Sequence, residues 1–239
     1  MKSAALAKLP DVHRWVEARA TLLAPEGRVF GMRTGDEASF VVREHASSAV
    51  FVVGLPDRGT LHAALARPPR ATEAIVGIEH AAVLATELHG WERSRIVVHA
   101  LRHPERLPPP DERVRFLDPD RIPRLAIDEE LKQKLEIGAQ GSDIAAYFVD
   151  DAPVAFCYVG AITETLWDVA IGTVEAHRRR GRAGCVAAHM IRHMQATGRR
   201  APVWQAVDEN PASSNLAAKL GFEVVDELVQ FRHEGVTSR

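Results

Sequence analysis

The chain has 239 residues, of which 46% are hydrophobic and 26% are charged, and its formal net charge is −2. This composition is typical of a globular protein with one large domain or two small ones. The near-neutral charge gives no general attraction to nucleic acid or to an anionic membrane, and no apolar run approaches the roughly 20 residues that span a bilayer. The N-terminal stretch lacks the continuous apolar core of a signal peptide. Cys157 and Cys185 lie in apolar surroundings, so we expect reduced thiols in a cytoplasmic protein.

The first half of the chain has the alternating signals of an α+β domain. Apolar residues at three- and four-residue spacing predict a helix over residues 1–24, which ends at Pro25-Glu26-Gly27. Further elements are predicted in this order: strands at 28–32 and 39–44 joined by a turn at Thr34-Gly35-Asp36, a strand at 49–54, helices around 60–66 and 79–88, and a strand at 95–100. We find no phosphate-binding turn, metal-ligand cluster or catalytic set in this half.

A Pro-rich, charged segment separates the two halves. We expect an extended linker at residues 107–112, between an N-terminal domain at 1–106 and a C-terminal domain at 113–239. The second half is predicted to contain strands at 113–117, 145–149, 153–159, 166–173, 202–207, 222–225 and 228–231. Its helices are predicted at 128–137, from Gly181 or Arg182 to Thr197 with a stop at Gly198, and from Asn210-Pro211 to Leu220-Gly221.

The strongest chemical signal is the segment from Arg178 to Gly184, where the strand at 166–173 gives way to a helix. The first backbone N–H groups of a helix have no intrahelical partner and carry the positive end of the helix dipole, so such a turn suits a phosphate. Gly181 and Ala183 let an anion approach the backbone closely. A solvated basic face or a nucleic-acid patch would also be rich in arginine. The position between an apolar strand and an amphipathic helix, without interleaved aromatic residues, favours the phosphate.

A second motif follows about thirty residues later, from Glu209 to Phe222. Its sequence is Glu-Asn-Pro-Ala-Ser-Ser-Asn-Leu-Ala-Ala-Lys-Leu-Gly-Phe. With Arg178, Gly181 and Ala183 in the first motif, it resembles the GNAT superfamily of acyl-CoA-dependent N-acyltransferases over roughly residues 113–233. The layout is similar to bacterial two-part members of that family. The resemblance implies an α/β fold with a mixed sheet, a GNAT-type acyltransferase fold preceded by a smaller α+β domain, and a sheet splayed between the strands at 166–173 and 202–207.

The resemblance also implies that acetyl-CoA binds as the acyl donor. Its pyrophosphate would meet the backbone amides of the turn, and its pantetheine arm would pair with the strand before the turn. Asn210 would meet the pantetheine or the far end of the cofactor, although a plain helix N-cap explains this residue equally well. The residues expected to bind the cofactor are Ile171, Gly172, Thr173, Arg178, Arg179, Arg180, Gly181, Arg182, Ala183, Gly184, Asn210 and Ser213.

The acyl thioester would lie near Asp168 and Trp204, where the amine attacks it directly without an acyl-enzyme. The family often has a tyrosine, proposed to protonate the leaving thiolate, at the position of Ala217. Because a free thiol has a pKa of about 8.5, a thiolate is a fair leaving group near neutral pH and the acid is not indispensable. Ser213, Ser214 or a water is an alternative proton donor.

A general base must take a proton from the acceptor's ammonium. The candidates are Asp168, Glu164, Glu175 and His177, and we favour the first two. Desolvation inside the apolar strand would raise the pKa of Asp168 towards neutrality, and Glu164 begins the same strand. The alternative for Asp168 is a side chain that faces solvent or pairs with an arginine. No histidine spacing suggests a metal site, and Cys185 is interpreted as a packing residue rather than a nucleophile.

We therefore expect an N-acetyltransferase that moves an acetyl group from acetyl-CoA to a primary amine of a small molecule or peptide, with no nucleic-acid or membrane partner. A homodimer is one option for its assembly. The replacement by Ala217 keeps a second hypothesis open, a catalytically idle acyl-CoA sensor or a structural partner domain. The N-terminal half would cover the acceptor cleft, supply a dimer surface, or be a degenerate copy of the same fold.

Overall fold

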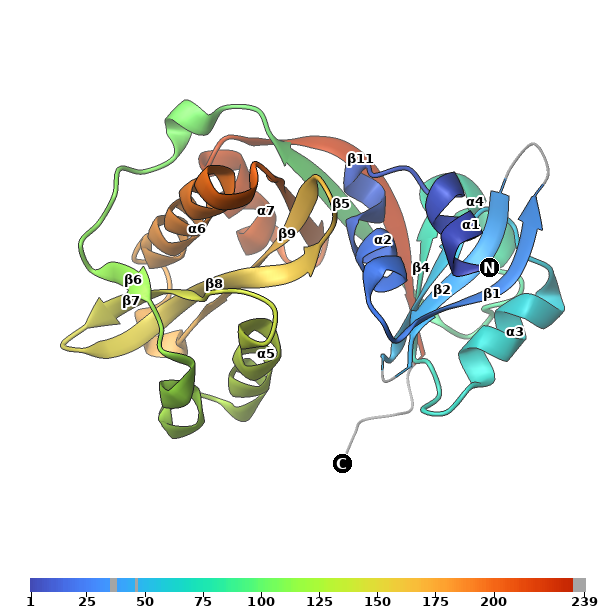
Figure 1. The fold of residues 1–239 in the computed structure, drawn as a ribbon, viewed down its shortest axis with the longest axis horizontal. Helices are drawn as coiled ribbons and strands as arrows, with labels where there is room; N and C mark the ends of the chain where they lie inside the picture. Colours follow the sequence, from blue (N-terminus) through green and yellow to red (C-terminus); the bar gives the residue numbers. More distant parts are fainter. Residues whose placement is uncertain (35–37, 46, 234–239) are drawn as a thin grey trace. The chain divides into compact units, whose positions relative to one another are not determined.

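The computed structural model describes residues 1–34, 38–45 and 47–233. The chain divides into two units. The first consists of residues 1–98, 205–211 and the chain from Val224 on, and the second consists of residues 99–204 and 212–223. Both units contain a sheet with helices packed on it (Figure 1). Within the described residues, no helix has the length and apolar character needed to cross a bilayer.

The first unit opens with helical segments rather than one long helix. They are α1 (Lys2–Lys8), a 3-10 turn (His13–Trp15) and α2 (Val16–Leu23). The single helix predicted over residues 1–24 is therefore wrong. Leu9, the residue that ends α1, is extended because it precedes Pro10, whose ring disfavours helical geometry at the preceding residue.

The remaining elements of this unit are β1 (Gly27–Thr34), β2 (Ala38–Glu44), β3 (Ala49–Val53), α3 (Arg58–Ala66), β4 (Glu73–Gly77), α4 (Ile78–Leu84) and β5 (Glu92–Leu101). Most agree with the prediction, but β4 was not predicted, because its apolar run of three residues, 74–76, lies between two predicted helices. The predicted turn at Thr34-Gly35-Asp36 lies, beyond Thr34, outside the described residues.

The strands of the first unit are ordered β1-β2-β3-β4, and β11 (Phe222–Arg232) follows β4. The β1–β2 and β2–β3 pairs are antiparallel, and β3–β4 is parallel because α3 crosses over between them. Leu228–Arg232 of β11 runs antiparallel to β4. The two strands predicted at 222–225 and 228–231 are one continuous strand.

The second unit contains strands and helices predicted for the C-terminal half. The strands are β6 (Val114–Phe116), β7 (Ala145–Val149), β8 (Ala152–Ile162), β9 (Leu166–Thr173) and β10 (Ala201–Val207), and the helices are α5 (Glu129–Ala139), α6 (Arg182–Gly198) and α7 (Pro211–Lys219). The unit also has three 3-10 turns that were not predicted, at Pro104–Arg106, Pro119–Arg124 and Glu175–His177. The left-handed residue after α6 is Arg199, with φ +50°, and not Gly198 as predicted. A Cβ on Gly198 would lie 2.6 Å from Arg200 Nη1, so the glycine makes room for that side chain.

The sheet of the second unit has the strand order β10-β9-β8-β7-β6. Its strands are antiparallel from β6 to β9, and β9 and β10 are parallel because α6 crosses over between them. Helix α5 covers one face of this sheet and α6 covers the other (Figure 1). The predicted apolar stripe of α6 is buried at Val186, Ala187, Met190, Ile191 and Met194.

The same order of elements occurs twice along the chain. Helical segments lead into three antiparallel strands, a helix crosses over to a parallel strand, and a further helix and strand follow. In the first half this run comprises α1 and α2, β1 to β3, α3, β4, α4 and β5. In the second half it comprises α5, β7 to β9, α6, β10, α7 and β11.

Candidate functional site

Strand β9 loses its parallel partner part of the way along. The register with β10 joins Leu166–Asp168 to Ala201–Val203 and ends there, whereas β9 continues to Thr173. On its other edge, β9 stays paired with β8 as far as Thr173. Side chains of β9 are buried up to Val169 and partly exposed beyond it. The strand therefore reaches the following turn with its second backbone edge outside the β10 register, as expected for a sheet splayed at this point.

The turn between β9 and α6 contains two residues in left-handed conformation, Arg179 with φ +59° and Gly181 with φ +76°. Left-handed residues within a turn point successive N–H groups to the same side, which creates a concave site for an anion. No side chain caps the start of α6 at Gly181, and a Cβ placed on this glycine would meet no atom within 4 Å in the described part of the chain. The helix start is therefore open towards a ligand.

The arginines of this turn fall into two groups. Arg178 Nε donates to the carbonyl of Thr173 at 3.2 Å, which ties the turn to the end of β9. Arg182 lies over the Tyr147 ring, 5.4 Å from its centroid, and its Nη1 contacts His177 Nδ1. Arg179 and Arg180 are exposed. Two of the four arginines predicted to bind the cofactor thus brace the turn, and the other two point charge towards solvent.

Of the two predicted bases, Asp168 is the buried one. Asp168 is only 8% exposed, so the alternative that its side chain faces solvent is wrong. Asp168 is also the last β9 residue in register with β10, so it lies where the two strands separate. Glu164 is exposed and lies in the turn between β8 and β9.

The groups around Asp168 respond to its charge. Burial, with a smaller contribution from Asp168, raises the pKa of the Cys157 thiol. Burial also raises the pKa of Tyr158 to about 12, and the negative charges of Cys157, Asp168 and Glu130 add to the shift. Tyr158 is therefore a neutral hydroxyl at physiological pH. Tyr158 carries no signal in the sequence, because only the strand register with β9 brings it near the predicted site.

Two residues of the second motif, Ser213 and Ala217, have small side chains, and Ser213 is hydrogen-bonded to a tryptophan of β10. Trp204 is 1% exposed, and its Nε1 donates to Ser213 Oγ at 3.0 Å. Ala217, where the resemblance predicts a tyrosine, is completely buried. Asn210 belongs to the residues of the first unit, where its N–H donates to the carbonyl of Val207 at 2.9 Å. Its predicted role at the cofactor therefore stays a prediction.

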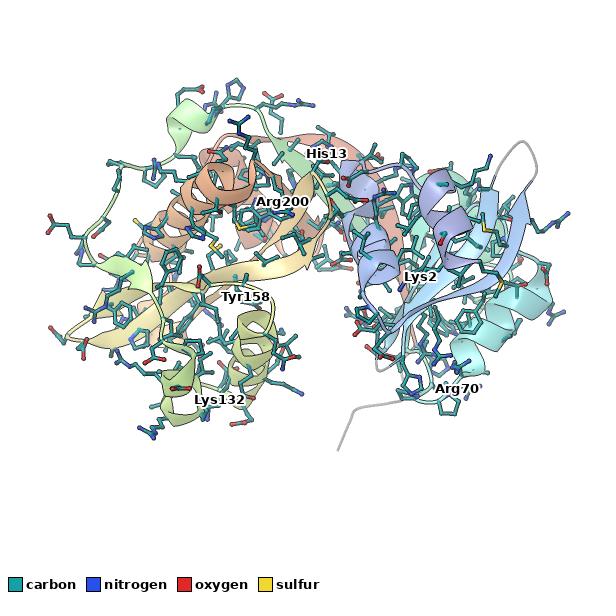
Figure 2. The ribbon with its side chains drawn as sticks, viewed as in Figure 1. Lys2, His13, Arg70, Lys132, Tyr158 and Arg200 are labelled. Atoms are coloured by element: carbon teal, nitrogen blue, oxygen red, sulfur yellow. The ribbon has the colours of Figure 1, made fainter. Side chains whose placement is uncertain are left out.

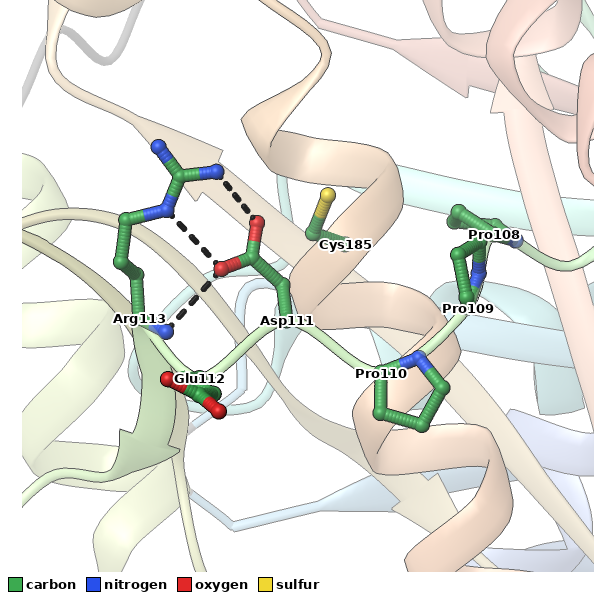
Figure 3. A pocket seen from close by; sticks show the side chains of 7 residues that line it. All are labelled: Pro108, Pro109, Pro110, Asp111, Glu112, Arg113 and Cys185. Carbon is green, nitrogen blue, oxygen red and sulfur yellow. Dashed lines mark hydrogen bonds and ion pairs between the residues drawn. The ribbon is translucent and has the colours of Figure 1, made fainter.

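A pocket of about 450 Å³ lies beside α6, where the Pro-rich segment passes it (Figure 3). It is lined by Pro108, Pro109, Pro110, Asp111, Glu112, Arg113 and Cys185. Arg113 donates to the Asp111 carboxylate at 2.9 and 2.8 Å, which holds the pKa of that carboxyl below its usual value. Burial, together with Asp111, raises the pKa of the Cys185 thiol. The interpretation of Cys185 as a packing residue is therefore incomplete, because its partly exposed side chain faces this pocket.

Comparison with known families gives one match within the chain. The model of the GNAT acetyltransferase family matches residues 145–231, from the start of β7 into β11. This range includes the β9–α6 turn and the second motif. No curated protein sequence matches the chain.

Solved structures similar to this chain include three that cover nearly all of it. A GCN5-related N-acetyltransferase-like protein from Streptococcus suis 89/1591 is 15% identical with a TM-score of 0.68, and 96% of each chain is covered. A GCN5-related N-acetyltransferase from Kribbella flavida is 16% identical with a TM-score of 0.60, covering 94% of this chain and 95% of that one. A tandem GNAT protein from the clavulanic acid biosynthesis pathway is 14% identical with a TM-score of 0.60, covering 100% of this chain and 95% of that one. At these identities the likeness establishes the fold.

Proposed function

Residues 145–231 form a GNAT acetyltransferase domain, and we propose that this domain transfers an acetyl group from acetyl-CoA to a primary amine by direct attack. One observation carries the proposal. The edge of β9 that leaves the β10 register is followed, after a 3-10 turn at Glu175–His177, by the uncapped start of α6 at Gly181. The extended pantetheine arm and the pyrophosphate joined to it in coenzyme A would thus meet successive stretches of backbone.

The cofactor would be held mainly by backbone groups. An extended pantetheine can add to the edge of β9 at Ile171, Gly172 and Thr173 as a further strand, because a strand edge offers unpaired N–H and C=O groups. The pyrophosphate would accept from the amides of Arg179 to Gly184 at the helix start. The exposed side chains of Arg179 and Arg180 add positive charge there.

In the reaction, the amine nitrogen attacks the thioester carbonyl carbon, the C–S bond breaks, and the thiolate leaves. Asp168 would take the proton that the acceptor's ammonium must lose, and Glu164 is the alternative base. Protonation of the thiolate does not require a dedicated acid near neutral pH. Ser213, whose Oγ accepts a hydrogen bond from Trp204 Nε1, is one alternative proton donor, and Ser214 or a water is another.

For the first half of the chain, residues 1–106 before the linker at 107–112, we propose a degenerate copy of the same fold without a cofactor site. The topology of β1–β3, α3 and β4 repeats that of β7–β9, α6 and β10. Two features of a cofactor site are altered in it. The parallel register of β3 with β4 runs from Ala49–Glu73 to Val52–Val76, almost the whole of β3.

The start of α3 in this half is occupied by the protein's own carboxylate. Asp57 accepts hydrogen bonds from Thr60 N at 2.9 Å and from Thr60 Oγ1 at 2.8 Å, and these bonds lower the pKa of Asp57. A carboxylate in this position fills the role that a phosphate would play at the start of α6. We therefore expect one acetyl-CoA per chain.

The proposal is tested by titration calorimetry with acetyl-CoA, followed by a thiol-release assay with a panel of primary amines. Binding at one molecule per chain with amine-dependent thiol release is the expected result. Tight binding without thiol release on any amine would instead support the acyl-CoA sensor, the alternative suggested by Ala217. Absence of acetyl-CoA binding would refute both. A stoichiometry of two would refute the assignment of the first half.

A further inference from the structure

Strand β8 carries an extra residue opposite Asp168. Its register with β9 joins Val159 to Val169 and then Ala161 to Asp168, so Gly160 is the inserted residue of a β-bulge. A bulge bends its strand and redirects nearby side chains, and bulges are frequent beside active sites. This bulge lies at the level where β9 leaves the β10 register.

Gly160 leaves room for the Asp168 carboxylate, which a larger residue would have to displace. A Cβ on Gly160 would lie 2.7 Å from Asp168 Oδ2, closer than real Cβ atoms approach an oxygen, and 3.6 Å from the Ala170 Cβ. Gly160 is not among the glycines with positive φ, so its backbone would accept an alanine. Glycine suits this position because it has no side chain, and its backbone conformation is not the reason. The Asp168 carboxylate occupies the space that a Cβ of residue 160 would fill.

The face of the sheet on which this carboxylate lies is the one covered by α5. Ala170 and Tyr158 are packed in the cluster that includes Leu131 and Leu135 of α5. Figure 2 shows Tyr158 between β8 and α5. Tyr158 pairs across the strands with Ala170, two residues after Asp168 on the same face. Asp168 therefore stands in a small-residue gap bounded by Gly160 and Ala170.

We propose that Gly160 is a positioning residue, which keeps the Asp168 carboxylate at the separation of β9 and β10 so that this carboxylate receives the ammonium of the acceptor. The inference rests on the proposed transferase function. The inference distinguishes Asp168 from Glu164, because of these two candidate bases only Asp168 has a carboxylate that occupies the space beside a glycine. It also gives the acceptor's direction of approach within the second unit, from the α5 side of the sheet.

The functional test compares Gly160→Ala with Gly141→Ala. Gly141 follows α5 in a turn, and a Cβ there would meet nothing within 4 Å among the described residues, so it is a neutral control. Displacing a reacting group by about 1 Å can reduce the rate by about a hundredfold. We expect Gly160→Ala to lower kcat for the amine by about tenfold or more, with the Kd of acetyl-CoA unchanged, and Gly141→Ala to change neither.

A double-mutant cycle shows whether Gly160 acts through Asp168. The expected result is that Gly160→Ala in an Asp168→Asn background lowers kcat no further than Asp168→Asn alone. Additive losses, or a loss confined to acetyl-CoA affinity, would overturn the proposal. Glu164→Gln should leave the kcat effect of Gly160→Ala intact; if it abolished that effect, the carboxylate assignment would fail.

A stability cycle separates failure of this inference from failure of the transferase proposal, because it needs no activity. Gly160→Ala should lower the urea midpoint of unfolding, and Asp168→Ala in the same chain should recover most of the loss by removing the colliding oxygen. If Gly160→Ala alone does not fold, restoration of folding by Asp168→Ala serves as the same test. No recovery in either form would show that the carboxylate does not occupy the gap and would overturn the inference.

Discussion

Replacing Gly181 by alanine is the sharpest test of the anion site at the start of α6. Gly181 has φ +76°, and its Cβ position is open to at least 4 Å among the described residues. An L-residue in left-handed conformation costs roughly 1–2 kcal/mol. Because no atom opposes the new methyl group, we expect a loss of unfolding free energy of about that size and no steric contribution beyond it.

The same chain offers a matched control for this strain. Gly90 has φ +80°, and a Cβ there also meets nothing within 4 Å. Gly90→Ala should therefore destabilise the protein by a similar amount, measured by urea unfolding, while lying outside the proposed site. The comparison of the two variants separates the effect of backbone strain from the effect on ligand binding.

Acetyl-CoA affinity should distinguish the two variants. In Gly181→Ala the methyl group, or a shift of the strained turn, keeps the pyrophosphate from the amides of the turn. We expect the Kd from calorimetry to rise about tenfold or more, which corresponds to about 1.4 kcal/mol, whereas Gly90→Ala keeps the native value. Equal affinities in the two variants, at equal stability, would show that the start of α6 does not bind the phosphates.

Three further predictions concern single side chains. Burial and the nearby Glu73 raise the pKa of Glu17 to about 7. The native protein therefore loses stability as the pH rises from about 4.5 through 7, because the unfolded chain ionises this group first. Glu17→Gln should raise the free energy of unfolding by on the order of 1–3 kcal/mol at pH 8 and change it little at pH 4, as measured by urea unfolding. Arg43 is 1% exposed and donates to backbone carbonyls of four residues. Arg43→Lys should therefore lower the free energy of unfolding by about 2–4 kcal/mol, because lysine cannot make all of these bonds. An unchanged urea midpoint would contradict this role. Ser213→Ala should cost about 1–2 kcal/mol, because it leaves the buried Trp204 Nε1 without its acceptor, while Ser214→Ala serves as the control.

Local sequence signals predicted the second half of the chain well. Strand β9 has the predicted bounds, Leu166–Thr173, and α6 begins at Arg182, one of its two predicted start residues. Both elements have a clear apolar pattern in the sequence. Gly181, in the turn between them, was predicted to let an anion approach the backbone closely. The predicted helix end at Leu220-Gly221 is also confirmed, since α7 ends at Lys219, and Gly221 has φ +93°.

The failures have long-range causes. The two strands predicted at 222–225 and 228–231 leave a break at Asp226 and Glu227, yet β11 is continuous. Arg14 binds Asp226, with Nε 2.6 Å from Oδ2, and Arg95 Nη1 lies 3.2 Å from Glu227 Oε1. These partners are 212 and 132 residues away in the chain. No local pattern could have predicted that these charges are neutralised in the sheet.

The same limit applies to the candidate site. The turn from Arg178 to Gly184 was recognisable because its residues are consecutive. Gly160 was not, because its significance depends on the strand register that sets it against Asp168. Likewise, the pocket at Cys185 depends on a contact between Arg192 and the carbonyl of Pro108, which are 84 residues apart. Motifs in one stretch of chain can be predicted from sequence, whereas groups gathered across strands need the fold.

The pairing of β11 with β4 has a consequence for synthesis. Residues 228–232 supply the neighbouring strand of β4, and Val229 and Phe231 join its core cluster with Val76. A nascent chain on the ribosome thus carries the first unit with an unprotected β4 edge until residues 228–232 have been made, and such edges template aggregation. The first unit begins to be translated first, yet its sheet is complete only when the β11 residues 228–232 have been added. A message truncated after Gly221 would encode the entire β9–α6 turn and still yield a protein whose N-terminal sheet lacks a strand.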